Sequence, residues 1–138
     1  MTDIFKRIVK FKLKWLAKIY LWRFKPYVIL VAGTTGRHWI KEKVKEILEE
    51  KNLSVRANKK NFNSEIGLPL SILDLPSGEG SFWQWLKILI DGLKICVNPR
   101  LDLRQSAYLV LEVAIDRPEN MNYLLSIVKP NIVILTTV

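Results

Sequence analysis

The stretch YVILVAGTTGRHW, residues 27–39, decides the fold. Its apolar run Tyr27–Val31 predicts a buried strand, a glycine-bracketed turn follows, and a helix-forming stretch begins directly afterwards. A phosphate-binding loop needs this order of strand, turn and helix, together with a lysine and then a hydroxyl residue. Arg37 and His38 stand in those two positions. The loop is therefore either a phosphate cradle with altered chemistry or simply a tight strand-to-helix turn.

The rest of the chain alternates between predicted strands and helices. The predicted strands are Tyr27–Ala32, Leu53–Ala57, Tyr108–Val113 and Ile132–Thr137. The predicted helices are Ile40–Lys51, Pro69–Leu75, Ser81–Val97 and Pro118–Val128. Loops are predicted at Asn58–Ile66 and Asn98–Gln105. This alternation predicts an α/β fold of the P-loop type in three layers. We expect a mainly parallel sheet of about four strands with helices on both faces, preceded by an N-terminal amphipathic helix.

Two of the predicted helices carry apolar patterns that suggest how they pack. In Ile40–Lys51, the spacing of Val44, Ile47 and Leu48 predicts an inward face. Ser81–Val97 is apolar nearly all round and includes Trp83 and Trp85, which favours a core helix over a second surface-seeking helix.

Composition limits the possible function classes. The chain has 138 residues, of which 49% are hydrophobic, so it can form one domain with a core and is not a disordered chain. Cys96 is the only cysteine, which excludes an internal disulfide and fits a reducing compartment, and one histidine makes a zinc site implausible. The net charge is +9, but residues 1–25 hold eight basic residues against one acidic residue. The nearly neutral body is not typical of a nucleic-acid-binding protein.

Residues 1–25 form a predicted basic amphipathic helix that we treat as a segment separate from the body, residues 26–138. Its apolar face holds Phe5, Ile8, Val9, Leu13, Trp15, Leu16, Ile19 and Tyr20. Eight charges exclude a spanning helix, and no uncharged apolar core of sufficient length suggests a cleaved signal peptide. Two interpretations remain open: the helix lies on an anionic membrane surface, or its apolar face packs on the domain.

Three ordered segments resemble the central ATPase domain of the Mur ligases. These enzymes join an amino acid or dipeptide to a UDP-muramyl precursor of peptidoglycan. The segments are Gly33–His38 at the position of the family's phosphate loop, residues 61–69 (NFNSEIGLP), and residues 111–118 (LEVAIDRP). The resemblance covers about residues 26–138, and residues 61–69 are similar to the subgroup that adds D-alanyl-D-alanine.

The resemblance implies ATP and Mg²⁺ as cofactors and a UDP-muramyl peptide as ligand. Carried over by position, the phosphate cradle would comprise Gly33, Thr34, Thr35, Gly36, Arg37 and His38. Glu112 would be the Mg²⁺ carboxylate, and Asn61, Asn63 and Glu65 would belong to the substrate loop. Each also has a simpler interpretation: the glycines form a tight turn, Glu112 is a solvent-facing carboxylate at a strand end, and the asparagines cap or turn a loop.

The sequence also departs from the family pattern. Arg37 is not equivalent to a lysine, His38 offers no hydroxyl for Mg²⁺, and Ala114-Ile115 replaces Gly-Ala beside the ligand. The family's later metal-binding histidine, modified lysine and C-terminal domain have no counterpart before Val138. We therefore expect no complete ligation by this chain alone.

Three functional hypotheses follow from this comparison. The chain is part of an ATP-dependent ligase that needs a second polypeptide, or a pseudo-ligase that binds or scaffolds at the membrane, or a decaying gene product with an exposed final strand. The resemblance implies a cytoplasmic location, with peripheral attachment to the inner face of the cytoplasmic membrane in the second case. The sequence does not identify the amino-acid substrate or the oligomeric state.

Overall fold

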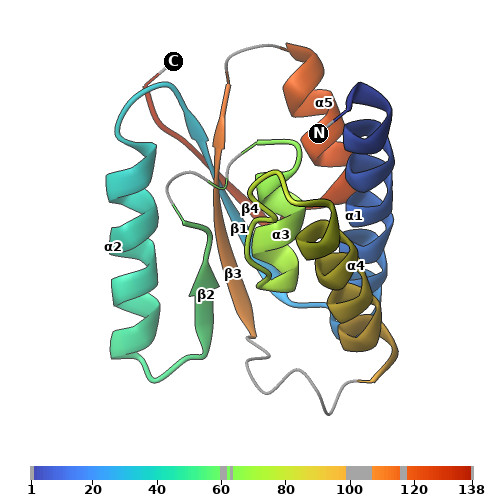
Figure 1. Ribbon diagram of the computed structural model, residues 1–138. Coiled ribbons are helices and arrows are strands. Elements are labelled where there is room, and N and C mark those ends of the chain that lie inside the picture. The colour runs from blue at the N-terminus through green and yellow to red at the C-terminus, as the bar shows by residue number, and fades with distance from the viewer. Residues whose placement is uncertain (1, 60–61, 63, 99–106, 116–117, 138) are drawn as a thin grey trace.

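A four-stranded parallel sheet lies at the centre of the computed structural model, which describes residues 2–59, 62, 64–98, 107–115 and 118–137. Its strands are β1 (Tyr27–Gly33), β2 (Val55–Ala57), β3 (Tyr108–Ala114) and β4 (Ile132–Leu135), in the order β2-β3-β1-β4 (Figure 1). The central strands β1 and β3 are buried along almost their whole length, which agrees with their continuous apolar sequences. The predicted α/β architecture is confirmed.

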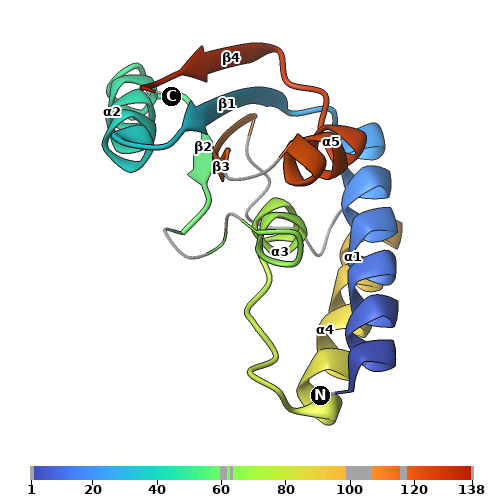
Figure 2. The ribbon, with the colours of Figure 1, turned by 90° about the horizontal axis from the view of Figure 1, so that it is seen from above.

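Helices cover both faces of the sheet. Among the described helices, α2 (Arg37–Glu50) alone lies on one face, and the other face carries α1 (Asp3–Phe24), α3 (Gly67–Leu73), α4 (Phe82–Val97) and α5 (Pro118–Ile127) (Figures 1 and 2). Alternate residues of β1 supply the two cores: Val28, Leu30 and Ala32 face the four-helix side, whereas Ile29 and Val31 face α2. This alternation follows from the period of two in a strand.

The N-terminal helix packs on the domain and also exposes apolar side chains. Val9, Leu13, Leu16, Ala17 and Tyr20 are buried, whereas Ile8, Trp15 and Ile19 of the predicted apolar face are exposed. The packing interpretation therefore holds for one stripe of α1, and a second apolar stripe faces away from the core. No helix among the described residues is long and apolar enough to cross a bilayer.

The structure corrects several details of the sequence prediction. The helix α2 begins at Arg37 rather than Ile40, so Arg37 and His38 lie in its first turn. Ile47 is exposed rather than inward-facing, since it lies off the stripe formed by Ile40, Val44 and Leu48. The strands β2 and β4 are shorter than predicted. Most of the predicted loop Asn98–Gln105 lies outside the described residues.

The helix α4 is not simply a core helix. Trp85, Ile88, Gly92 and Cys96 are buried, but Trp83 and five other apolar residues of α4 are exposed. Cys96 is buried in the core, and its thiol donates to the Leu16 carbonyl at 3.3 Å.

Candidate functional site

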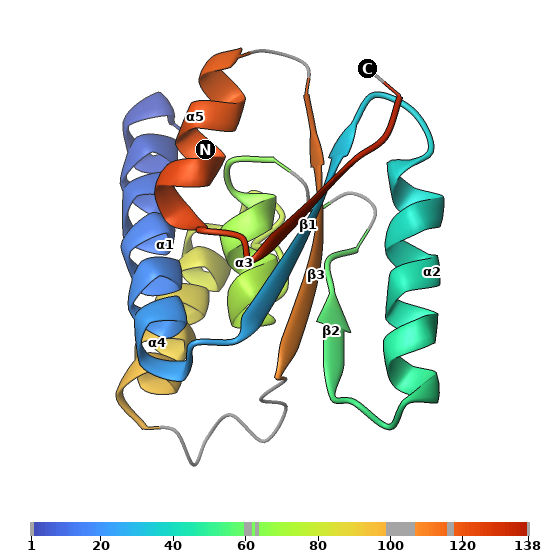
Figure 3. The same ribbon diagram turned by 180° about the vertical axis from the view of Figure 1, so that it is seen from behind.

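The glycine loop follows β1 at the carboxyl edge of the sheet, seen from behind in Figure 3. Gly33 has φ 155°, and an added Cβ atom would lie 1.7 Å from Thr136 Oγ1, so close packing against the segment after β4 requires glycine. Gly36 has φ 77° and is the N-cap of α2. In open parallel sheets, ligands bind outside this edge.

The segment after β4 already occupies part of the loop. The Thr34 amide donates to the Thr137 carbonyl at 3.0 Å, and the Thr34 hydroxyl donates to the same oxygen at 2.8 Å. Thr35 and Thr137 also form an antiparallel bridge. One backbone amide of the predicted phosphate cradle is therefore engaged within the chain.

Arg37 turns back onto the loop that precedes it. One guanidinium nitrogen donates to the carbonyls of Gly33 at 2.9 Å and Thr34 at 3.0 Å. The Arg37 Nε atom lies 3.8 Å from Glu112 Oε1. In this arrangement the guanidinium caps carbonyls, whereas the lysine of a phosphate loop points at phosphate oxygens.

Glu112 is the centre of a buried ion cluster between β3 and α2. Its residue is 1% exposed, so the interpretation as a solvent-facing carboxylate is wrong. Glu112 Oε2 lies 2.9 Å from Lys41 Nζ and 2.9 Å from His38 Nδ1. The Lys41 side chain is fully buried, and its ammonium group also donates to the Asn58 carbonyl at 2.5 Å. We call Lys41, His38, Glu112 and Asn58 the ion cluster.

Asn58 fixes the position of Glu112 through the backbone. Its amide nitrogen donates to the carbonyl oxygens of Glu112 and Phe62, both at 3.0 Å, and its side-chain oxygen accepts from the Glu112 amide at 2.8 Å. This two-way bond ties β3 to the segment after β2. The backbone of Glu112 is therefore held by Asn58, and its carboxylate is held by Lys41.

Sequence reasoning missed Lys41 and Asn58. Lys41 lies on the same helical stripe as Val44 and Leu48, which pack inward. A lysine on an inward stripe is almost never fully buried unless it is paired, so its position signals a buried carboxylate partner. No comparable signal marked Asn58, because asparagine is common in loops.

The environment of Glu112 favours its charged form. Burial on its own would raise the pKa of Glu112, but hydrogen bonds and charge from Lys41 and His38 outweigh burial and lower the pKa below its ordinary value. The carboxylate is therefore held ionised as the partner of a buried ammonium group.

The residues present do not fit Mg²⁺ at Glu112. Mg²⁺ takes oxygen ligands in octahedral geometry. Here Oε2 faces two nitrogen groups, and Oε1 faces the Arg37 guanidinium. The described residues contain no group of three or more histidine, cysteine, aspartate or glutamate side chains that could hold a metal.

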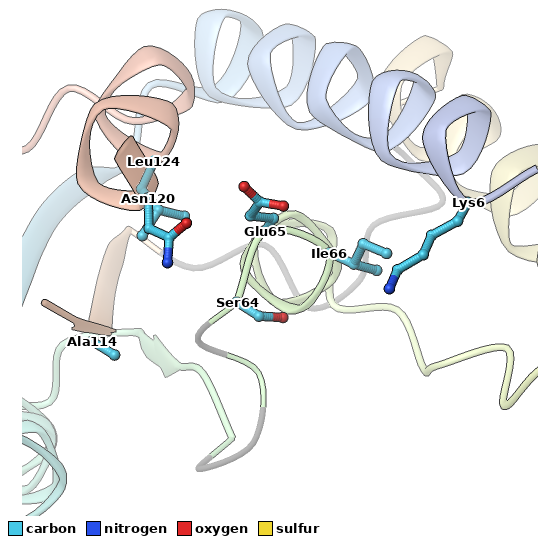
Figure 4. Close-up of a pocket in the computed structure, with 7 residues that line it drawn as sticks. All are labelled: Lys6, Ser64, Glu65, Ile66, Ala114, Asn120 and Leu124. Atoms are coloured by element: carbon cyan, nitrogen blue, oxygen red, sulfur yellow. The ribbon is translucent and has the colours of Figure 1, made fainter. Parts of the chain in front are cut away.

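A pocket also lies at the carboxyl edge of the sheet, beside the end of β3. A cavity of about 430 Å³ is lined by Lys6, Ser64, Glu65, Ile66, Ala114, Asn120 and Leu124 (Figure 4). Its lining comes from α1, the segment before α3, the end of β3 and α5. Glu65, predicted for the substrate loop, also pairs with Lys10 at 2.7 Å. Asn61 and Asn63 lie outside the described residues.

Comparison with solved structures shows that this fold is similar to part of the MurF ligases. No family model matches the chain. The chain is similar to the MurF ligase from Thermotoga maritima in complex with ADP, with a TM-score of 0.66 and 29% identity over 94% of this chain and 24% of that chain. MurF from Acinetobacter baumannii gives a TM-score of 0.64 and 18% identity over 91% of this chain and 22% of that chain.

A second structure from the same organism, the UDP-N-acetylmuramoylalanyl-D-glutamyl-2,6-diaminopimelate–D-alanyl-D-alanyl ligase, gives the same values. This chain therefore spans about a quarter of the length of these proteins. It has the fold of a Mur ligase nucleotide-binding domain, and the resemblance stated from the sequence is supported at that level.

Proposed function

We propose that this chain is a pseudo-ligase: a Mur-ligase-type domain that binds ligands of peptidoglycan precursor synthesis without joining them. The observation that supports this most directly is the ion cluster, in which Lys41 Nζ lies 2.9 Å from the carboxylate of Glu112. A buried lysine holds the carboxylate that the family resemblance assigns to Mg²⁺.

The chemistry of phosphoryl transfer explains why it matters that Lys41, in place of Mg²⁺, pairs with Glu112. Transfer of a phosphoryl group depends on positioning and on cations that offset charge on the phosphate oxygens. In this chain, Arg37 is hydrogen-bonded to loop carbonyls and Lys41 is hydrogen-bonded to Glu112 and Asn58. Both cations are therefore already engaged by groups of the chain, which supports binding without transfer.

Two features remain available for ligands. The first turn of α2 follows Gly36, and helix N-termini attract anions through unpaired amides and the helix dipole. The cavity beside Glu65 and Asn120 offers polar groups next to apolar Leu124. We infer that phosphate of a nucleotide binds weakly at α2, and that a UDP-muramyl peptide is the ligand class for the cavity.

Nucleotide titration by calorimetry, with and without Mg²⁺, tests this proposal. Because Lys41 already pairs with Glu112, we expect the affinity for ATP to change less than about tenfold, or 1.4 kcal/mol, when Mg²⁺ is added. The double variant Arg37→Lys, His38→Thr restores the family's residue types and should bind ATP more tightly if the cradle survives. Micromolar binding that requires Mg²⁺ and disappears in Glu112→Ala would contradict the pseudo-ligase.

One observation favours the alternative of a split ligase that works with a second polypeptide. The strand β4 pairs only with β1 among the described strands, and its Ile132, Val133 and Leu135 are exposed. A partner strand could extend the sheet at that edge. This alternative requires Glu112 to exchange Lys41 for Mg²⁺, so strong Mg²⁺ dependence in the same titration would favour it. ADP release that depends on a UDP-muramyl tripeptide would favour it further.

A further inference from the structure

Exposed apolar side chains are concentrated on two neighbouring helices, α1 and α4. Nineteen large apolar residues are exposed among the described residues, and twelve of them belong to these helices. They are Ile4, Ile8, Phe11, Trp15, Ile19 and Trp22 on α1, and Phe82, Trp83, Leu86, Ile90, Leu93 and Val97 on α4. We call these twelve residues the outer apolar face. Scattered exposed apolar residues are ordinary on a protein surface, but a contiguous set indicates a binding surface.

The two helices run parallel and side by side (Figures 1 and 2). Their first turns meet through the rings of Phe5 and Phe82, whose centroids are 5.0 Å apart. Their last turns meet where the Arg23 guanidinium donates to the carbonyls of Cys96 at 2.6 Å and Val97 at 3.1 Å. These contacts at both ends indicate that α1 and α4 are packed together along their length as one unit.

The exposed stripes of the two helices point the same way. Each helix has a separate buried stripe, for example Leu13 and Ala17 on α1 and Ile88 and Gly92 on α4. The exposed residues of α1 recur at intervals of three and four, so they form a single stripe on the side away from the core. The same spacing holds on α4 from Trp83 to Val97, and Phe82 directly precedes Trp83. Because both helices turn their buried stripes to one core, the outer stripes together form one surface.

Basic residues border this surface on both sides. Each of four lysines is the sequence neighbour of a stripe residue: Lys14 of Trp15, Lys18 of Ile19, Lys87 of Leu86 and Lys94 of Leu93. Lys18 Nζ lies 4.9 Å from the centre of the Trp15 ring. The two helices together carry nine basic residues against two acidic residues. This border would repel an equally charged second copy, but it complements an anionic surface.

We propose that the outer apolar face binds the surface of a bilayer containing anionic lipids. Both helices lie in the interface plane, and the apolar side chains enter the boundary between headgroups and acyl chains. Trp15, Trp22 and Trp83 lie at headgroup depth, and lysines beside the stripes extend to lipid phosphates. The site extends the single-helix membrane interpretation, because α4 supplies half of the apolar residues. It does not depend on the proposed pseudo-ligase function.

Flotation of the full chain with lipid vesicles tests the proposal. We expect recovery with vesicles of phosphatidylcholine and phosphatidylglycerol, and little recovery with phosphatidylcholine alone or at high salt. The variant Trp22→Ser, Trp83→Ser removes one exposed ring from each helix and should lower recovery about tenfold. Trp39→Ser, which removes an exposed ring from α2, is the matched control and should float like the original protein.

A charge-reversal pair separates lipid electrostatics from apolar contact. Lys87→Glu, Lys94→Glu on α4 should weaken binding to anionic vesicles about tenfold or more, because each basic residue near an anionic surface contributes to binding. Lys45→Glu on α2, combined with Lys51→Glu at the C-cap of that helix, makes the same charge change on the opposite face of the sheet and should bind normally. Unchanged circular dichroism spectra for all variants would show that they are folded.

Two outcomes would overturn the proposal. Equal recovery of the original protein and Trp22→Ser, Trp83→Ser with anionic vesicles would mean that the outer apolar face does not carry binding. A dimer detected by light scattering that is lost in the same variant, together with no vesicle binding, would assign the face to a second copy of the chain instead.

Discussion

The two sides of the sheet differ in burial: charged side chains are buried on one side, and apolar side chains are exposed on the other. On the α2 side, charged groups are buried and satisfied by one another: Lys41 and Glu112 are fully enclosed and joined at 2.9 Å. On the side of α1 and α4, apolar groups are exposed, with Trp22 and Trp83 about three-quarters accessible. Charges inside and tryptophans outside both invert the ordinary distribution. We therefore expect the ion cluster to contribute to folding stability and the outer apolar face to contribute little to it.

The largest effect should come from separating the buried ion pair. Lys41→Met leaves the Glu112 carboxylate buried without its ammonium partner, and we expect unfolding by urea to show a loss of about 3–5 kcal/mol. The double variant Lys41→Met, Glu112→Gln removes both charges and should recover much of that stability. A loss below about 1 kcal/mol in the single variant would mean that Lys41 is solvated in solution.

Substitutions of Trp85 and Trp83 allow the buried and exposed sides of one helix, α4, to be compared. Trp85 is 4% exposed and Trp83 is 74% exposed. Trp85→Ala should lower the free energy of unfolding by about 3 kcal/mol or more because it leaves a cavity in the core. Trp83→Ala should stay within about 0.5 kcal/mol of the original protein. If Trp83→Ala and Trp85→Ala lowered the melting temperature by similar amounts, the outer apolar face would be packed within the fold.

Asn58 should have an intermediate effect. Asn58→Ala removes the bonds to the backbone amide and carbonyl of Glu112 and leaves both groups buried. We expect a loss of about 2 kcal/mol, which chemical denaturation can measure. Asn58→Asp is a useful companion, because it keeps the acceptor for the amide but places a second negative charge beside Glu112. If both variants were as stable as the original protein, the hydrogen bonds between Asn58 and the Glu112 backbone would not hold β3.

The smallest of these effects is a dependence of stability on acid. The folded pKa of Glu112 lies below the unfolded value of about 4.3, so its contribution is complete above that value and is lost as the pH falls through the folded pKa. Glu112→Gln should therefore flatten the decline of unfolding free energy between about pH 5 and pH 3. Glu50→Gln, at an exposed position on α2, serves as the control. An unchanged decline in Glu112→Gln would contradict the pairing.

The sequence predicted the sheet better than it predicted the site. The apolar runs at Tyr27–Val31 and Tyr108–Val113 determine buried central strands, and those strands occupy the centre of the sheet. The family resemblance assigned ligand-binding roles to Arg37, His38 and Glu112. Arg37 and His38 both lie within ion-pair distance of Glu112, but the three residues pair within the chain.

The ion cluster and the outer apolar face depended on information that local patterns do not contain. Sequence spacing placed Lys41 on a helix, but only the packing of α2 against β3 shows that its ammonium group reaches Glu112. The apolar pattern nearly all round α4 favoured a core helix, whereas the helix has both a buried and an exposed apolar stripe. Both features are decided by tertiary contacts.

The coupling free energy between Lys41 and Glu112 is the strongest test of whether Glu112 is the partner of a buried lysine. A double-mutant cycle with Lys41→Met, Glu112→Gln and the combined variant, measured by urea unfolding with and without Mg²⁺, isolates this pair. We predict a coupling above about 1.5 kcal/mol and no stabilisation of the original protein by Mg²⁺. A coupling below about 0.5 kcal/mol, together with stabilisation by Mg²⁺ that Glu112→Gln abolishes, would show that Glu112 is a metal ligand and not the partner of a buried lysine.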